Sequence, residues 1–156
     1  MRVINLTNSY DFVLVSDLTY FTLNLLNTKW YRCGSGMIQA TSRKLKYVFL
    51  HKLICPSDHE TDHIDKNYLN NQDDNLRPCS SSQNKVNRKK SKNCNSRFPG
   101  VWKDKRCHSS WIVLTQKHRK RFYGGTFSSE IEAAQAAKIL YERIHGKFSP
   151  YNNINI

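Results

Sequence analysis

The chain has 156 residues, of which 38% are hydrophobic, and this is enough for one ordinary domain or two small ones. Lys and Arg outnumber Asp and Glu by 25 to 12, and the net charge of +13 favours a polyanionic partner, with nucleic acid as the first candidate. No apolar run reaches membrane-spanning length, no signal peptide opens the chain, and the five cysteines include no C-x-x-C pair. We therefore expect an intracellular protein that is not secreted and has no membrane partner, disulfide framework or zinc knuckle.

Residues 1–49 are predicted to form a small β-rich region. Short apolar runs rich in Val, Ile, Tyr and Trp begin at residues 2, 11, 29 and 45, and polar turns separate them. This pattern is typical of strands, and it predicts a strand for each run, including the last one over residues 45–54. The intervening segment 16–26 predicts a short helix.

An acidic segment follows, because six of the twelve acids lie between Asp58 and Asp74, and such a cluster favours a hard cation. Within it, the letters HETDH at 59–63 satisfy the H-E-x-x-H pattern of zinc peptidases. That chemistry needs both histidines on one face of a helix, but the surrounding Pro, Ser, Thr and Asp residues are poor helix formers without a 3.6-residue period. A third ligand is also missing nearby, since the next His is His108 and the next Glu is Glu130.

The alternative interpretation uses the adjacent pair Asp62-His63. Two short strands around His63 and Arg77, joined by an Asn- and Asp-rich loop and followed by a helix from about Ser80, would bring Asp62 and Asn84 together. Both side chains offer oxygens, as magnesium prefers, and they leave room for phosphate and water. The imidazole of His63, with a reference pKa of about 6.5, suits a general base near neutral pH.

The same residues carry a family resemblance. Asp62-His63, Asn75-Leu76-Arg77 and Gln83-Asn84 match without a gap the order found in HNH nucleases. Residues 50–90 therefore resemble the ββα-metal module of the phage and group I intron homing endonucleases.

This resemblance implies that Asp62 and Asn84 hold the metal, that His63 activates water, and that Asn75 bonds backbone groups across the loop to fix the angle of His63. His51 is expected in a strand, and two roles stay open for it: contact with the scissile phosphate or a purely structural role. Two roles also stay open for Arg77: stabilisation of charge on the phosphate or simple solvation at the end of its strand. The chain departs from the family at Lys66, where Gly is frequent, and at Gln72, where Arg is frequent.

Positive charge concentrates after this module. Thirteen Lys or Arg and a single acid, Asp104, lie between Lys85 and Arg121, so a phosphate backbone could lie along this stretch. We expect residues 91–95 to be a basic linker, and four nearby cations to track phosphates: Arg88, Lys89, Lys90 and Lys92.

Residues 96–152 predict three strands, within 99–105, 110–116 and 120–127, followed by a helix. Ser129 and Glu132 form a capping-box pattern, Gly146 suits a C-terminal cap, and one face is predicted to carry Ile131, Ala134, Ala137, Tyr141 and Ile144.

The segment, with its GVW, W-x-V, GGTF and HGKF motifs, resembles the Apetala-two type of DNA-binding domain, known from ethylene-response factors and homing endonucleases. In that family the sheet enters the major groove, and a β-ribbon fits there. The resemblance implies DNA contacts from Trp102, Gln116, Arg121, Tyr123 and Thr126. Pro99 and Asp104 replace arginines usual in the family, so we expect backbone affinity more than base-specific recognition.

The sequence thus predicts an α+β protein with four parts: a β-rich region (1–49), an HNH module (50–90), a basic linker (91–95) and a DNA-binding domain (96–152). The expected function is that of a metal-dependent endonuclease, a monomer in solution, that hydrolyses double-stranded DNA with magnesium or manganese. The implied setting is a phage, intron or large virus. The alternative is a DNA-binding regulator whose nuclease module has decayed.

Overall fold

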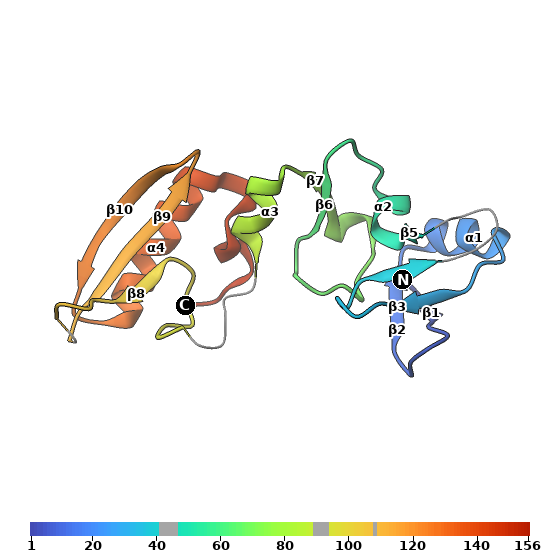
Figure 1. Ribbon diagram of the computed structural model, residues 1–156, viewed down its shortest axis with the longest axis horizontal. Coiled ribbons are helices and arrows are strands. Elements are labelled where there is room, and N and C mark those ends of the chain that lie inside the picture. The colour runs from blue at the N-terminus through green and yellow to red at the C-terminus, as the bar shows by residue number, and fades with distance from the viewer. Residues whose placement is uncertain (41–46, 89–93, 108) are drawn as a thin grey trace. The chain divides into compact units, whose positions relative to one another are not determined.

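The computed structural model describes residues 1–40, 47–88, 94–107 and 109–156 (Figure 1). Within these ranges the chain forms two compact units, Met1–Ser81 and Ser82–Ile156, called here the first and the second unit. Helices and strands are mixed in both, so the α+β class expected from the sequence is confirmed. None of the helices in these ranges is long and apolar enough to cross a bilayer.

The first unit begins with a hairpin, a helix and a small sheet. Strands β1 (Arg2–Asn5) and β2 (Phe12–Val15) pair antiparallel, and helix α1 (Asp17–Leu25) follows them. The second sheet is antiparallel in the order β3-β4-β5, with these bounds: β3 Trp30–Arg32, β4 Ile38–Ala40 and β5 Val48–Phe49. The strands and the helix predicted between residues 2 and 40 are therefore confirmed.

One prediction in this region was wrong. The strand expected over 45–54 ends at Phe49 where the structure describes it, and helix α2 (Leu50–Ile54) replaces its second half. Leu50 is fully buried and Leu53 and Ile54 pack against the same core, which is the i, i+3, i+4 spacing of a helix. His51 therefore lies on a helix and not in a strand.

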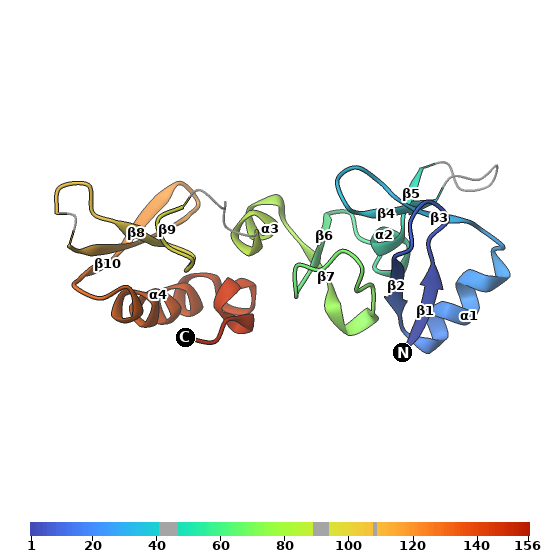
Figure 2. The ribbon, with the colours of Figure 1, turned by 90° about the horizontal axis from the view of Figure 1, so that it is seen from below.

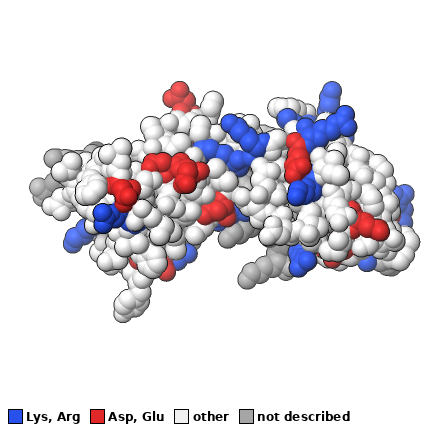
Figure 3. All heavy atoms as spheres, turned by 180° about the vertical axis from the view of Figure 1, so that it is seen from behind, with Lys and Arg blue, Asp and Glu red and all other residues white. Residues whose placement is uncertain are grey.

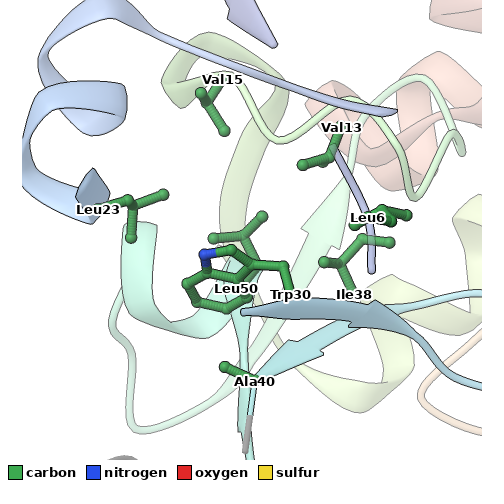
Figure 4. Close-up of a cluster of buried hydrophobic side chains, with 8 residues drawn as sticks. All are labelled: Leu6, Val13, Val15, Leu23, Trp30, Ile38, Ala40 and Leu50. Atoms are coloured by element: carbon green, nitrogen blue, oxygen red, sulfur yellow. The ribbon is translucent and has the colours of Figure 1, made fainter. Parts of the chain in front are cut away.

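The core of the first unit joins residues from most of these elements. Figure 4 shows its buried side chains converging from β2, α1, the small sheet and α2. They are Leu6, Val13, Val15, Leu23, Trp30, Ile38, Ala40 and Leu50. Burying such side chains stabilises a fold by about 1.5–3 kcal/mol each relative to exposure, so this region and α2 stabilise one another.

The hairpin that carries Asp62 and His63 completes the first unit. Strands β6 (Glu60–His63) and β7 (Leu76–Cys79) pair antiparallel, with Asp62 opposite Arg77, and the short 3-10 helix η1 (Asp73–Asn75) leads into β7. Helix α3 (Ser81–Asn87) starts where the sequence placed it. Because residues 60–63 form a strand, successive side chains alternate between its two faces, and the helical geometry of a zinc peptidase is ruled out.

The second unit is a three-stranded antiparallel sheet, in the order β10-β9-β8, covered on one face by helix α4 (Figures 1 and 2). The bounds are β8 Val101–Lys103, β9 Trp111–Lys117, β10 Lys120–Phe127 and α4 Glu130–His145, and the 3-10 helices η2 (Gly146–Phe148) and η3 (Pro150–Asn153) follow. All three predicted strands and the predicted helix are confirmed.

Helix α4 has a capping residue at each end. The Ser129 hydroxyl accepts a hydrogen bond from the Ile131 N–H at the N-terminus, and Gly146 has a φ of +55° at the C-terminus, so both residues cap the helix as predicted. Glu132, the second residue of the predicted capping box, accepts instead from the Ser128 hydroxyl at 3.5 Å. The predicted buried face was partly wrong, because Ile131 is 43% exposed while Ala133 is buried beside Ala134. The small side chains let the helix approach the sheet closely, so the contact stripe is centred on alanines.

Candidate active site and nucleic-acid interface

The pair singled out in the sequence lies on β6, inside the first unit. Asp62 is 6% exposed and His63 is 4% exposed. A charged carboxylate and an imidazole at this depth cost free energy unless other groups hydrogen-bond to them. The contacts of these two side chains therefore define what the site can do.

His63 is held in one tautomer by Asn71. Nε2 of the ring lies 3.2 Å from Oδ1 of Asn71, while Nδ2 of Asn71 donates a 2.8 Å hydrogen bond to the Tyr68 carbonyl. The second bond fixes the amide orientation, because only the NH₂ group can donate to a carbonyl. Oδ1 of Asn71 must accept from His63, so Nε2 carries the proton and the lone pair of the neutral ring lies on Nδ1.

Asn71 is in turn fixed by the N-terminal hairpin. Its backbone N–H donates to the Leu14 carbonyl at 2.8 Å, and the Leu14 N–H donates to the Leu69 carbonyl at 2.7 Å. A single residue of β2, Leu14, therefore holds the β6–β7 loop by two backbone bonds. Asn71 itself is 1% exposed. The sequence predictions did not include Asn71 among the site residues, although it is the direct partner of His63.

Aromatic rings enclose the imidazole of His63. The ring centroids of His51 and Tyr68 lie 5.4 Å from that of His63, both in edge-on geometry, and Phe49 stacks on His51 at 5.5 Å. Burial lowers the pKa of His51 to about 4, assisted by the charges of His63 and Lys52. His51 is therefore neutral at pH 7 and adds no positive charge next to His63.

The ionisation of His63 also favours the neutral ring. Burial lowers its pKa below the ordinary value of 6.5, and the bond to Asn71 opposes this shift. The nearby carboxylates of Asp65 and Asp62 also oppose it. A neutral imidazole can accept a proton at physiological pH, which is the property that a general base requires.

Asn75 makes the cross-loop bonds that the resemblance implied. Its Oδ1 accepts from the Asp65 N–H at 3.1 Å, and its Nδ2 donates to the Asn70 carbonyl at 2.7 Å and to Oδ1 of Asp65 at 2.9 Å. The Asn75 carbonyl also accepts from the Ile64 N–H at 2.9 Å. These bonds fix the chain directly after His63.

The loop also contains one left-handed residue. Lys66 has a φ of +63°, which is the conformation that glycine adopts at little cost. Lys66 stands where the family frequently has Gly, and the turn forms here with lysine at this position.

Asp62 faces a cation of the chain itself. Nε and Nη2 of Arg77 donate to Oδ2 of Asp62 at 3.0 and 2.7 Å, and the Arg77 side chain is only 12% exposed. The pairing follows from the register, since the two residues lie opposite each other on β6 and β7. The charge of this buried carboxylate is thus compensated by a guanidinium.

The donors available for a metal are oxygens. In the ranges that the structure describes, no group of three or more His, Cys, Asp and Glu side chains is placed to hold an ion. Asp62 supplies a carboxylate in the first unit, and Asn84 lies on α3. A carboxylate and an amide oxygen fit a hard divalent ion such as Mg²⁺ or Mn²⁺ better than zinc. That Asn84 joins Asp62 at one ion stays a prediction.

The residues predicted to contact DNA share one face of the second unit's sheet. Trp102 and Thr126 pair with Ile112, Tyr123 with Leu114, and Arg121 with Gln116. Residues opposite each other in a sheet point to the same side, and residues 112, 114 and 116 alternate with Val113, which is buried against α4. Trp102 and Tyr123 are 47% and 63% exposed.

A β-bulge keeps this face continuous. The register shifts between Tyr123 and Gly125, so Tyr123 and Thr126 lie on the same side although they are three residues apart, and their hydroxyl groups are 2.7 Å apart. On the opposite side of the sheet, which faces α4, Phe122 pairs with the buried Thr115.

The basic segment is only partly described. Arg88 is exposed directly after α3, whereas Lys89, Lys90 and Lys92 lie outside the described residues. On the face shown in Figure 3, Lys and Arg side chains gather in groups, with some carboxylates beside them. The role of the basic linker therefore stays a prediction.

No family model matches the chain, and no solved structure matches it. Among curated proteins, the chain is similar to an uncharacterized HNH endonuclease of Acanthamoeba polyphaga mimivirus. The two are 28% identical over 174 residues, which cover 96% of this chain and 89% of the relative. The chain is therefore a distant homologue of a protein named HNH endonuclease, and the similarity extends through both units.

Proposed function

We propose that the protein is a metal-dependent endonuclease that hydrolyses phosphodiester bonds in double-stranded DNA. The observation that carries this proposal is the buried His63, whose ring is enclosed by aromatic side chains and whose tautomer is set by Asn71. The distant similarity to an HNH endonuclease supports the same chemistry.

His63 is the general base of the proposed reaction. With the proton on Nε2, Nδ1 takes a proton from the attacking water, and the carbonyl-type oxygen of Asn71 stabilises the positive charge that develops on the ring. Asn75 holds the backbone after His63, so the ring does not rotate away during proton transfer.

Asp62 and Asn84 are the proposed ligands of magnesium or manganese. When bound, such an ion supplies electrostatic stabilisation of the negative charge on the phosphate. Arg77 orients the Asp62 carboxylate. His51, itself in the neutral form, packs edge-on against the His63 ring and restricts its position. The resemblance implies products with 5′-phosphate and 3′-hydroxyl ends.

The second unit is the proposed DNA-binding part, of the Apetala-two type. Its outward face would contact the duplex through Trp102, Gln116, Arg121, Tyr123 and Thr126, and the basic segment would follow phosphates through Arg88, Lys89, Lys90 and Lys92. The high positive charge supports binding to the DNA backbone.

A cleavage assay tests the proposal. Purified protein is incubated with a plasmid library and Mg²⁺ or Mn²⁺, and nicked and linear products are measured. We expect cutting by the natural sequence and by His59→Ala, which alters an exposed histidine of the same unit. His63→Ala should lose at least about 100-fold in rate, the usual contribution of a general base. Binding of DNA without any cutting would support the decayed nuclease instead.

A further inference from the structure

The turn between β9 and β10 has an unusual combination of backbone and sequence. Lys117 pairs with Lys120, so the loop has two residues, and His118 and Arg119 have φ values of +49° and +64°. Two positive φ angles in a two-residue loop define a type I′ turn, which favours Asn-Gly because those residues adopt this conformation with little strain. His-Arg is a poor choice for the backbone alone.

Strained backbone that is kept in a fold points to a function for the side chains it presents. His118, Arg119 and Lys120 are all exposed. The side chain of Lys117, in contrast, is bonded within the fold, because its Nζ donates to the Ile144 carbonyl at the end of α4. The turn is therefore anchored by Lys117 and projects the neighbouring basic side chains.

The turn also forms one wall of a cavity within the second unit. The cavity measures about 440 Å³ and none of its eight lining residues is acidic: Ser82, Lys85, Val86, Thr115, Gln116, His118, Arg119 and Tyr141. In the part of the chain that the structure describes, no carboxylate forms an ion pair with Arg119 or Lys85. Two cations with hydroxyl and amide groups around them favour an anion of phosphate type.

We propose that this cavity binds one phosphate of the nucleic-acid backbone, held by Arg119 and Lys85. Gln116 lines the cavity and also belongs to the outward face of the sheet, so the site lies at the border of the proposed DNA-binding surface. The inference rests on the proposed function, because it takes DNA as the ligand. It adds Arg119 and Lys85 as residues that position the duplex on the sheet.

The salt dependence of DNA binding tests the assignment. Binding of the full chain to a labelled duplex is measured by fluorescence anisotropy without divalent metal, over a series of KCl concentrations. Arg119→Gly and Lys85→Gln should each reduce the slope of log affinity against log salt by about 0.9, and the affinity at 0.1 M salt by roughly eightfold.

A control variant separates this contact from general charge. Lys138→Gln removes one exposed charge from α4 and should leave the slope unchanged. Equal slopes for the natural sequence and either test variant, or an equal loss in Lys138→Gln, would overturn the proposal.

Thermal unfolding gives a second, independent result. Glycine at a φ of +64° relieves backbone strain, so Arg119→Gly should raise the Tm by about 4 °C while it weakens binding. A lower Tm would contradict the strain on which the inference depends.

Two further outcomes distinguish the ligand and the underlying proposal. If inorganic phosphate raised the Tm of the natural sequence but not of Arg119→Gly, and the DNA slopes were equal, the site would be one for free phosphate and not for DNA. If the natural sequence bound no DNA at all, the proposed function would fail together with this inference, whereas DNA binding with unchanged slopes would refute this inference alone.

Discussion

The ion pair between Asp62 and Arg77 gives a prediction whose size follows from burial. Asp62 and Arg77 are 6% and 12% exposed in their side chains, so neither charge is well hydrated. Arg77→Met leaves the carboxylate in place and removes the guanidinium that donates two hydrogen bonds to Oδ2. Removing one partner of a buried pair costs about 3–5 kcal/mol, because the other charge stays buried. We expect a loss of this size in the free energy of unfolding.

Metal-free urea denaturation of four proteins isolates the pair: the natural sequence, Arg77→Met, Asp62→Asn and the double variant. The double variant should lose less than the sum of the two single losses, with a coupling of about 2 kcal/mol, because it leaves neither charge unbalanced. Arg2→Met is a matched control, since Arg2 pairs with Asp17 at the surface, where the two side chains are 54% and 60% exposed. Such a pair contributes about 0–1 kcal/mol.

A manganese titration extends this prediction to the proposed metal site. In Arg77→Met the ion can take over the neutralisation of Asp62, so Mn²⁺ should stabilise this variant more than the natural sequence. At one fixed Mn²⁺ concentration, 100 times the dissociation constant of the variant, the variant would gain about 2.7 kcal/mol. Losses that add within about 0.5 kcal/mol in the double variant would refute the role of the pair. Equal stabilisation of both proteins by Mn²⁺ would refute the expectation that the ion neutralises Asp62 when Arg77 is absent.

Three further predictions concern single positions. The pKa of about 4 for His51 lies below the unfolded value of 6.5, so the contribution of His51 to stability is fully present above pH 6.5 and should fall by about 3 kcal/mol as the pH is lowered to 4. His51→Phe should remove this part of the pH dependence in denaturant titrations at several pH values. Gly100→Ala would place a Cβ 2.4 Å from Tyr141 at a φ of +71°, and should cost at least about 3 kcal/mol in the same assay; a loss below 1 kcal/mol would contradict the close packing. Lys66→Gly relieves a φ of +63° and should stabilise the first unit by about 1 kcal/mol, seen as a higher denaturation midpoint; a lower midpoint would show that the lysine side chain contributes more than the strain costs.

The sequence predicted the elements in which a local signal and the tertiary contacts agree. Helix α4 is an example, because Ser129 and Gly146 mark its ends as they do in the structure. The hairpin around His63 was also predictable, since an Asn- and Asp-rich loop separates two short runs and the following Ser81 opens a helix. In both cases the turn and cap residues restrict the backbone without help from distant contacts.

Helix α2 was missed for a reason of length. Its five residues, Leu50–Ile54, are too few to distinguish a helical period from a buried strand, and the preceding strand β5 continues the same apolar run. Only packing distinguishes the helix from a strand, because Leu50 lies in the core and Leu53 and Ile54 pack against it. The consequence reaches the site, since this helix presents His51 to the ring of His63.

Asn71 shows a different limit of sequence reasoning. The loop contains Asn67, Asn70, Asn71 and Asn75, and each could cap a turn or point inward by its residue type alone. Family spacing selected Asn75, whose bonds hold the backbone. The side chain that touches His63 is Asn71, and its direction depends on the bond from its N–H to Leu14. A contact between residues 57 positions apart in the chain leaves no local pattern.

This long-range bond assigns a role to the N-terminal hairpin, in which the sequence shows no chemical motif. Strand β2 buries Val13 and Val15 in the core and, on its backbone, holds Leu69 and Asn71 through Leu14. Strands β6 and β7 with their loop span only residues 60–79, and a segment shorter than about 40 residues rarely folds without metal or disulfides. The core of the first unit therefore does two things at once. It supplies the apolar burial that the hairpin lacks, and it sets the position of the amide that fixes the tautomer of His63.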